Sequence, residues 1–157
     1  MAFILSAGAT LRLLAARTDD PFVQWIEYDQ VRPFIGVATM AIVRHAILTT
    51  DTVQAEYRRV FERRYQALAR DLDANQRKQV IPAIFDLKSA EILSDILSIS
   101  SDGGMLSDID LMPAAVAMQH NFELVVTEHT DAWGAFASAI SPVLGRLFLK
   151  PFPDEVA

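Results

Sequence analysis

The 157-residue sequence contains no cysteine, and this absence removes several kinds of chemistry at once. Without cysteine the chain forms no disulfide, holds no zinc ion through thiolates and offers no thiol nucleophile. A glycine-rich phosphate loop is missing too, because the segment Ser6-Ala-Gly8-Ala that follows the first apolar run is too short for that motif. The absence of this loop weighs against one possible function, that of a generic small α/β ligand-binding domain.

Long apolar runs and a surplus of basic residues are also absent. No apolar run reaches the roughly 18 residues of a membrane-spanning helix, and the apolar N-terminus lacks the basic leading segment of a secretion signal. We therefore expect a cytoplasmic protein without a membrane partner. With 20 acidic against 14 basic residues, the net charge of -6 disfavours tight binding to a phosphate backbone and suits a basic protein partner or a cation better.

The composition is that of an ordinary globular domain. Hydrophobic residues make up 52% of the chain and charged residues 22%. A chain of this length buries about two thirds of its unfolded surface. The sequence shows no repeat, no low-complexity tract and no domain boundary, so we expect residues 1–157 to form a single domain.

Short apolar segments alternate with amphipathic ones along the chain. Strands are expected at 3–5, 34–37, 80–85, 124–126 and 147–149, helices at 10–16, 22–28, 39–45, 51–72, 86–99, 110–120 and 133–140, and loops at 73–75 and 100–104. Asp20, Thr39, Asp51 and Asp86 are expected to cap helices. The alternation predicts an α/β fold with a central parallel sheet of about four to five strands and helices on both faces.

The segment from Asp110 to His129 carries the strongest signal for a functional site. An acid begins a helix rich in small apolar residues, and a turn and a short buried strand then lead to a polar cluster. Ligand sites of parallel sheets lie at the carboxyl ends of the strands. The positions expected to meet at that edge are Ser6, Ile42, Asp110 and the loop from His129 to Ala132.

Five sequence blocks in a fixed order carry a family resemblance. They are Phe3-Ile-Leu-Ser6-Ala-Gly8, Thr39-Met-Ala-Ile42, Asp110-Leu-Met-Pro-Ala-Ala-Val-Ala-Met-Gln-His120, Phe122-Glu-Leu-Val-Val-Thr127-Glu-His129-Thr-Asp131-Ala132-Trp133 and Lys150-Pro-Phe152. The third is close to the pattern Asp-x-Leu-Ile-Ala-Ala-Thr-Ala-x-x-His. Together the blocks resemble the PIN-domain family, and within it the VapC-type toxins of bacterial toxin–antitoxin pairs, over nearly the whole length.

The resemblance implies metal-dependent RNA cleavage, in which clustered carboxylates hold Mg²⁺ or Mn²⁺. Residue by residue, only Asp110 keeps the family's acid. Ser6 replaces the acid after the first strand, Ile42 replaces a glutamate, and Ala132 replaces the last aspartate, with Asp131 one residue early. A neutral hydroxyl is a poor Mg²⁺ ligand, and an isoleucine is none at all.

These replacements allow two interpretations of the site. In the first, the chain is a degenerate PIN-like domain that has lost ribonuclease activity, needs no cofactor and acts as a protein-binding or regulatory module. In the second, it is an active Mg²⁺- or Mn²⁺-dependent endoribonuclease toxin with a reduced site built from Asp110 and Asp131, assisted by Asp108 or Ser6. We favour the first. The resemblance implies a homodimer and an antitoxin-like basic partner, and RNA is a partner only under the second.

Several polar residues also have structural explanations. Asp110 stands where a helix cap is favoured, and we weigh capping above metal binding. The remaining residues expected to line the edge of the site are Gly8, Thr39, Asp108, Thr127 and His129. A separate basic concentration, which we expect to be a solvated helix face paired with Glu56, Glu62 and Asp71 rather than an RNA or partner patch, comprises Arg58, Arg59, Arg63, Arg64 and Arg70.

Overall fold

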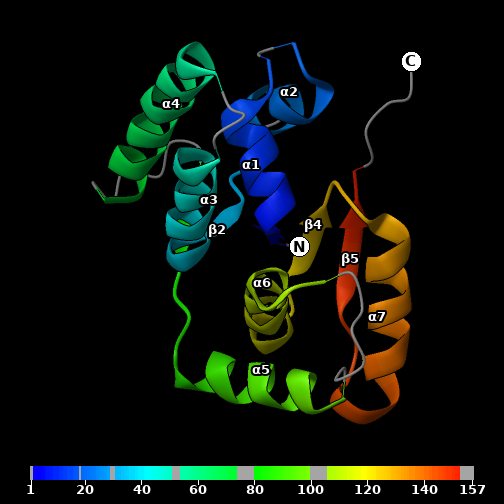
Figure 1. Cartoon of the computed structure of the whole chain (residues 1–157). Helices are drawn as coiled ribbons and strands as arrows, with labels where there is room; N and C mark the ends of the chain where they lie inside the picture. The colour runs from blue at the N-terminus through cyan, green and yellow to red at the C-terminus, as the bar shows by residue number, and fades with distance from the viewer. Residues whose placement is uncertain are drawn as a thin grey trace.

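The computed structural model describes residues 2–17, 19–28, 31–50, 54–73, 80–99 and 106–152. Strands and helices alternate along the chain (Figure 1). In chain order the elements are β1 (Phe3–Leu5), α1 (Ala7–Ala15), α2 (Pro21–Tyr28), β2 (Phe34–Gly36), α3 (Val37–Thr49), α4 (Ala55–Asp73), β3 (Ile81–Ala83), α5 (Leu87–Ile99), α6 (Asp108–His120), β4 (Glu123–Val126), α7 (Thr130–Leu144) and β5 (Phe148–Pro151).

The strands form one five-stranded sheet in the order β3-β2-β1-β4-β5, and every neighbouring pair is parallel. The first strand lies at the centre, with Ile4 opposite Leu124 of β4 and opposite Phe34 of β2. The predicted α/β fold with a parallel sheet is confirmed, including the final strand at one edge. Since all strands point the same way, their carboxyl ends share one edge of the sheet.

Helices cover both faces of the sheet, as the sequence predicts. Successive strand residues point to opposite faces. Leu5 and Val125 accordingly pack in one core with α1 to α4, while Ile4 and Leu124 pack in a second core with α5 to α7. Figure 1 shows the two groups of helices, α1 to α4 in the upper part of the view and α5 to α7 in the lower part.

Two of the predicted helix caps are confirmed. The Asp20 carboxylate accepts a hydrogen bond of 2.7 Å from the backbone N–H of Phe22 at the start of α2. The Asp86 carboxylate accepts one of 3.0 Å from the backbone N–H of Ser89 at the start of α5. The proposed Asp51 cap and the 100–104 loop lie outside the described residues, as do residues 74 and 75 of the proposed turn, and Asp73 ends α4.

The prediction that Thr39 caps a helix is wrong. The second strand runs directly into α3, which begins at Val37 with Gly36 as its N-cap, so Thr39 lies inside the first turn. A Cβ at residue 36 would lie 2.9 Å from the Thr39 hydroxyl oxygen, and this close approach explains the glycine. The helix also continues to Thr49, beyond its predicted end.

Three other helices begin earlier than predicted. Ser6 accepts a hydrogen bond from the backbone N–H of Ala9 and so starts α1 at Ala7. The sixth helix begins at Asp108 behind an N-cap at Ser107. The seventh begins at Thr130, so the segment expected to be a loop from His129 onward is a helix start.

The arginines of α4 are used differently from the prediction. Glu62 pairs with Arg44 of α3 at 2.8 Å rather than with an arginine of its own helix. Arg64 donates to the carbonyl oxygens of Leu14 and Ala16, the last carbonyls around the end of α1. The guanidinium groups of Arg44 and Arg64 therefore connect α4 with α3 and with α1. Within the described part of the chain, no helix combines the length and apolar character that crossing a membrane requires.

Candidate functional site

Ser6 lies at the carboxyl end of the central strand and is 3% exposed. Its hydroxyl oxygen accepts from the backbone N–H of Ala9 at 3.1 Å, and its backbone N–H donates to the carbonyl of Val125 at 3.0 Å. Its carbonyl accepts from both the N–H and the hydroxyl of Thr10, at 2.9 and 2.8 Å. Each polar group of Ser6 therefore has a partner within the fold.

The start of α3 brings apolar groups toward the same edge. Thr39 is buried and Ile42 is half-buried on this helix. Between the starts of α3 and α6 lies a cavity of only about 20 Å³, whose lining includes Thr39, Met112 and Val116. A space of that size holds about one water molecule, and its lining does not include Ser6, Ile42 or Asp110.

Asp110 occupies the third position of α6 and is half-buried. One of its carboxylate oxygens, Oδ2, accepts from the backbone N–H and from the hydroxyl of Ser107, each at 2.9 Å. This arrangement is the carboxylate half of a capping box. The sequence carries the signal for it, Ser107-Asp-Ile-Asp110, but the capping partner Ser107 was not singled out. Asp108, the first residue of the helix, is exposed.

Glu128 is a site residue that the sequence reasoning did not select. A Cβ at Gly8 would lie 3.2 Å from both Cδ and Oε1 of Glu128, so the glutamate side chain rests across the first turn of α1. Thr127, just before it, is 4% exposed, and its hydroxyl oxygen has no hydrogen-bond partner among the described residues. Glu128 lies two residues beyond the end of β4, the neighbour of β1, and this position was the available signal.

The last group of predicted site residues lies at the start of α7. His129 has a left-handed backbone with φ of 52° and precedes the helix, and its Nε2 is 3.9 Å from Oε2 of Glu128. Asp131 is exposed in the first turn, and Ala132 is half-buried. Consecutive helical residues point about 100° apart. The Asp131 side chain therefore points in a different direction from the side chain of Ala132, the residue at the position of the family's last aspartate.

The carboxylates are not gathered into one group. Among the residues that the structure describes, no three histidine or acidic side chains lie together in a way that could hold a metal ion. The structure brings Ser6, Gly8, Thr127 and Glu128 to the ends of β1 and β4. Asp110 remains with Ser107 in its capping box.

Two shifted carboxyl groups belong to helix caps. Burial raises the pKa of Asp20, but hydrogen bonds from Arg12 and from the N–H of Phe22, with the charge of Arg12, outweigh it, so that the pKa is lowered overall. The hydrogen bond from the N–H of Ser89, followed by that from the Gln119 side chain, lowers the pKa of Asp86. Their positions at the starts of α2 and α5 give both shifts a structural explanation.

Comparison with known protein families identifies the class. Residues 22–134, more than half of the chain, match the family described as PIN domain, and the protein belongs to this family. No curated protein sequence matches the chain.

Solved structures share the fold over almost the entire chain. VapBC2 from Rickettsia felis, bound to a DNA fragment from the promoter, contains a chain of 13% identity and TM-score 0.65, with 97% of this chain and 99% of that one covered. A chain of FitAB bound to the IR36 DNA fragment has 18% identity and TM-score 0.62, covering 95% and 94%. FitAcB from Neisseria gonorrhoeae gives 19% identity and TM-score 0.61, covering 94% and 95%.

Proposed function

We propose that this chain is a degenerate PIN domain of the VapC and FitB type, which has lost metal-dependent ribonuclease activity and serves as a protein-binding module. The observation that carries the proposal is the state of Ser6. At the position where the family places its first acid, this residue is buried, uncharged and hydrogen-bonded through each of its polar groups. Its hydroxyl oxygen already accepts a hydrogen bond from the backbone N–H of Ala9, and the side chain carries no negative charge.

The other positions support the same proposal. Ile42 and Ala132 are apolar, and the Asp110 carboxylate already accepts two hydrogen bonds from Ser107. Mg²⁺ is held by oxygen ligands, with carboxylates supplying the charge. The described residues at this edge do not fit that requirement, since no three acidic or histidine side chains lie together. We therefore do not propose metal-dependent RNA cleavage for this chain.

The kind of partner is inferred from the similar structures. Those structures are described as VapBC and FitAB complexes, two of them with DNA. We infer an antitoxin-like protein partner and a homodimeric assembly for this chain. A domain without catalysis would keep such contacts, because protein interfaces do not depend on the acidic residues of a metal site.

An active endoribonuclease with a reduced site is the alternative. It requires the Asp110 carboxylate to leave Ser107 and to work with Asp131, which is exposed on the first turn of α7. Glu128, whose side chain lies against Gly8, is the one additional carboxylate that favours this reading.

Calorimetric titration of the wild type with Mn²⁺ tests the proposal, with Asp110→Ala as the control. We expect no Asp110-dependent heat at millimolar Mn²⁺. RNA cleavage is then assayed with protein in stoichiometric amounts. Binding or cleavage that disappears in Asp110→Ala would overturn the proposal and establish the reduced metal site.

A further inference from the structure

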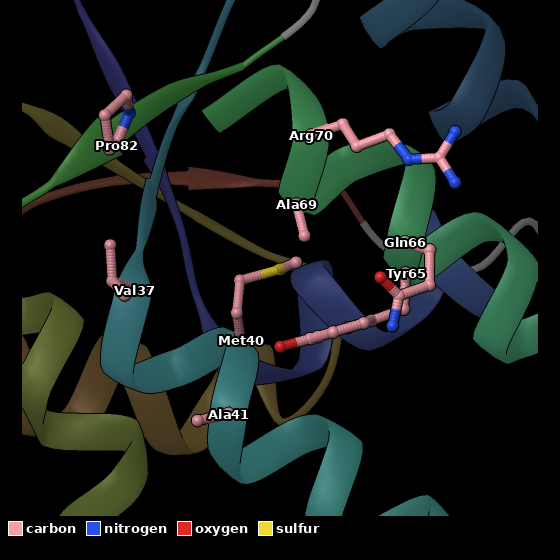
Figure 2. Close-up of a pocket in the computed structure, with 8 residues that line it drawn as sticks. All are labelled: Val37, Met40, Ala41, Tyr65, Gln66, Ala69, Arg70 and Pro82. Carbon is pink, nitrogen blue, oxygen red and sulfur yellow. The ribbon is translucent and has the colours of Figure 1, made fainter. Parts of the chain in front are cut away.

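An open groove lies where α3, α4 and β3 meet. We call it the α3–α4 groove; it has a volume of about 450 Å³. Its apolar lining includes Val37, Met40, Ala69 and Pro82, drawn from α3, α4 and β3. Figure 2 shows the Met40 side chain directed toward Ala69. Val37 is 55% exposed, so this apolar surface is accessible from solvent.

A row of exposed arginines continues from the groove along α4. Arg59, Arg63, Gln66 and Arg70 follow one another at intervals of four, three and four residues, which places them on one face of the helix. We call these four residues the arginine row. It extends over about 16 Å, given a rise of ~1.5 Å per residue. Gln66 and Arg70 also line the groove, so the row and the groove are continuous.

The arginine row lacks acidic partners among the described residues. Glu62 is bound by Arg44, and no described carboxylate lies within ion-pair distance of Arg59, Arg63 or Arg70. In a chain of net charge -6, this row is a local reversal of sign. One guanidinium group at the groove, that of Arg70, and two more farther along the same helix face complement carboxylates that flank an apolar side chain.

The groove is poorly suited to a nucleobase. Among the described lining residues Tyr65 is the one aromatic side chain, and its ring is already covered by the guanidinium of Arg44 at 5.4 Å and stacked with Phe61 at 6.5 Å. Single-stranded nucleic acids bind through aromatic platforms and extended positive grooves. The mainly aliphatic lining and the acidic net charge therefore favour a protein segment over RNA.

We propose that the α3–α4 groove and the arginine row dock an acidic, amphipathic segment of a protein partner. One apolar side chain of the segment enters the groove, and its carboxylates bind Arg63 and Arg70, with Arg59 extending the contact. This inference rests on the proposed function as a protein-binding module. The inferred acidic segment differs from the basic partner expected from the net charge of the chain. A short segment interacts with the charges nearest to it, and here those are the arginines of α4.

Selection from a displayed library of random peptides on the full-length protein tests this docking surface. We expect the selected peptides to be enriched in acidic residues around a large apolar residue. A synthetic peptide of the enriched sequence should bind the double variant Arg63→Glu/Arg70→Glu at least 10-fold more weakly. Ala41→Gln, which adds bulk at an exposed position of the groove lining, should also weaken binding.

The matched control is Lys88→Glu/Arg146→Glu, which reverses two exposed charges outside α3 and α4. We expect this control to bind the peptide like the wild type, and circular dichroism and melting curves to show that all variants are folded. Peptides without acidic enrichment, no enriched peptide, or binding unaffected by the α4 variant would overturn the inference. So would tighter binding of a 12-nucleotide oligouridylate to the same arginines.

The two proposals fail separately. RNA cleavage that depends on Asp110 would end the proposal of a degenerate site, while the peptide experiment measures binding at α3 and α4 only. Peptide binding that the groove variants leave unchanged would overturn the docking inference and would leave the proposal of a degenerate site untouched.

Discussion

Replacing Asp110 with alanine separates its role as a helix cap from a role in metal binding. In the structure its carboxylate accepts two hydrogen bonds of 2.9 Å from Ser107 at the start of α6. Alanine removes the acceptor and the negative charge at the positive end of the helix. Asparagine removes the charge but keeps an oxygen that can accept the same hydrogen bonds. A capping role therefore predicts that Asp110→Asn costs less stability than Asp110→Ala.

The expected magnitude follows from the exposure of the group. Loss of a helix-capping side chain costs about 0.5–2 kcal/mol, and the interaction of a charge with the helix dipole contributes about 0.3–1 kcal/mol. Asp110 is only half-buried, so solvent screens part of this energy. We expect Asp110→Ala to lower the free energy of unfolding by about 1 kcal/mol, and Tm by about 2–4 °C for a domain of this size.

Melting curves recorded with and without MnCl2 distinguish the two roles. If Asp110 only caps the helix, Asp110→Ala lowers Tm by the same amount with and without MnCl2. A metal-binding role would raise the Tm of the wild type alone, since a ligand at about 100 times its Kd stabilises the folded state by ~2.7 kcal/mol. Asp108→Ala is the matched control, because Asp108 lies in the same turn and is exposed. Equal losses for the alanine and asparagine variants, or a manganese effect confined to the wild type, would refute the capping argument.

Three further predictions concern the site and the ion pairs around it. Ser6→Asp combined with Ile42→Glu should gain Mn²⁺ affinity at some cost in stability, because Ser6 is buried and Ile42 is half-buried. A melting temperature that manganese leaves unchanged would count against the alignment of these residues with the family's acids. Asp20→Asn should lower stability at neutral pH by about 2 kcal/mol, because it leaves the guanidinium of Arg12, 11% exposed, without the carboxylate that binds it at 3.0 Å. Since the pKa of Asp20 is lowered in the fold, its contribution is present above the unfolded pKa and disappears as pH falls through the folded pKa, so wild type and variant should converge in urea titrations in strong acid. Arg64→Ala should cost about 1–3 kcal/mol by leaving the last carbonyls of α1 without their donor, and Arg63→Ala, its exposed neighbour, should unfold like the wild type.

Much of the fold could be predicted from local patterns. The strand at Phe3–Leu5 is short and apolar because it is buried at the centre of the sheet, where both faces are covered. Asp20 before proline and Asp86 before an apolar run are local capping signals, and both caps were confirmed. Two of the wrong helix starts, those of α1 and α3, occurred where almost no loop separates strand and helix. The run from Gly36 to Thr39 is one such place, where a glycine without a Cβ lets the Thr39 side chain pack against the end of the strand.

The candidate site was only partly predictable, for a physical reason. The motif order located the acids and their replacements at one edge of the sheet. Hydrogen-bond partners depend on groups that tertiary structure brings close, so the full engagement of Ser6, which involves Val125 of a distant strand, could not be read from neighbours in the chain. The position of Glu128 against Gly8 is likewise a contact between β4 and α1 that sequence spacing does not encode.

The sequence by itself determined the class of fold, the direction of the sheet and the identities of the residues at its carboxyl edge, because apolar periodicity and helix signals act over a few residues. Tertiary structure alone decided which of those residues have partners. It placed Glu62 on Arg44 of α3 rather than on an arginine of its own helix, and it placed Arg70 beside an apolar groove. Charge pairing depends on distances between elements, and the folded chain sets those distances.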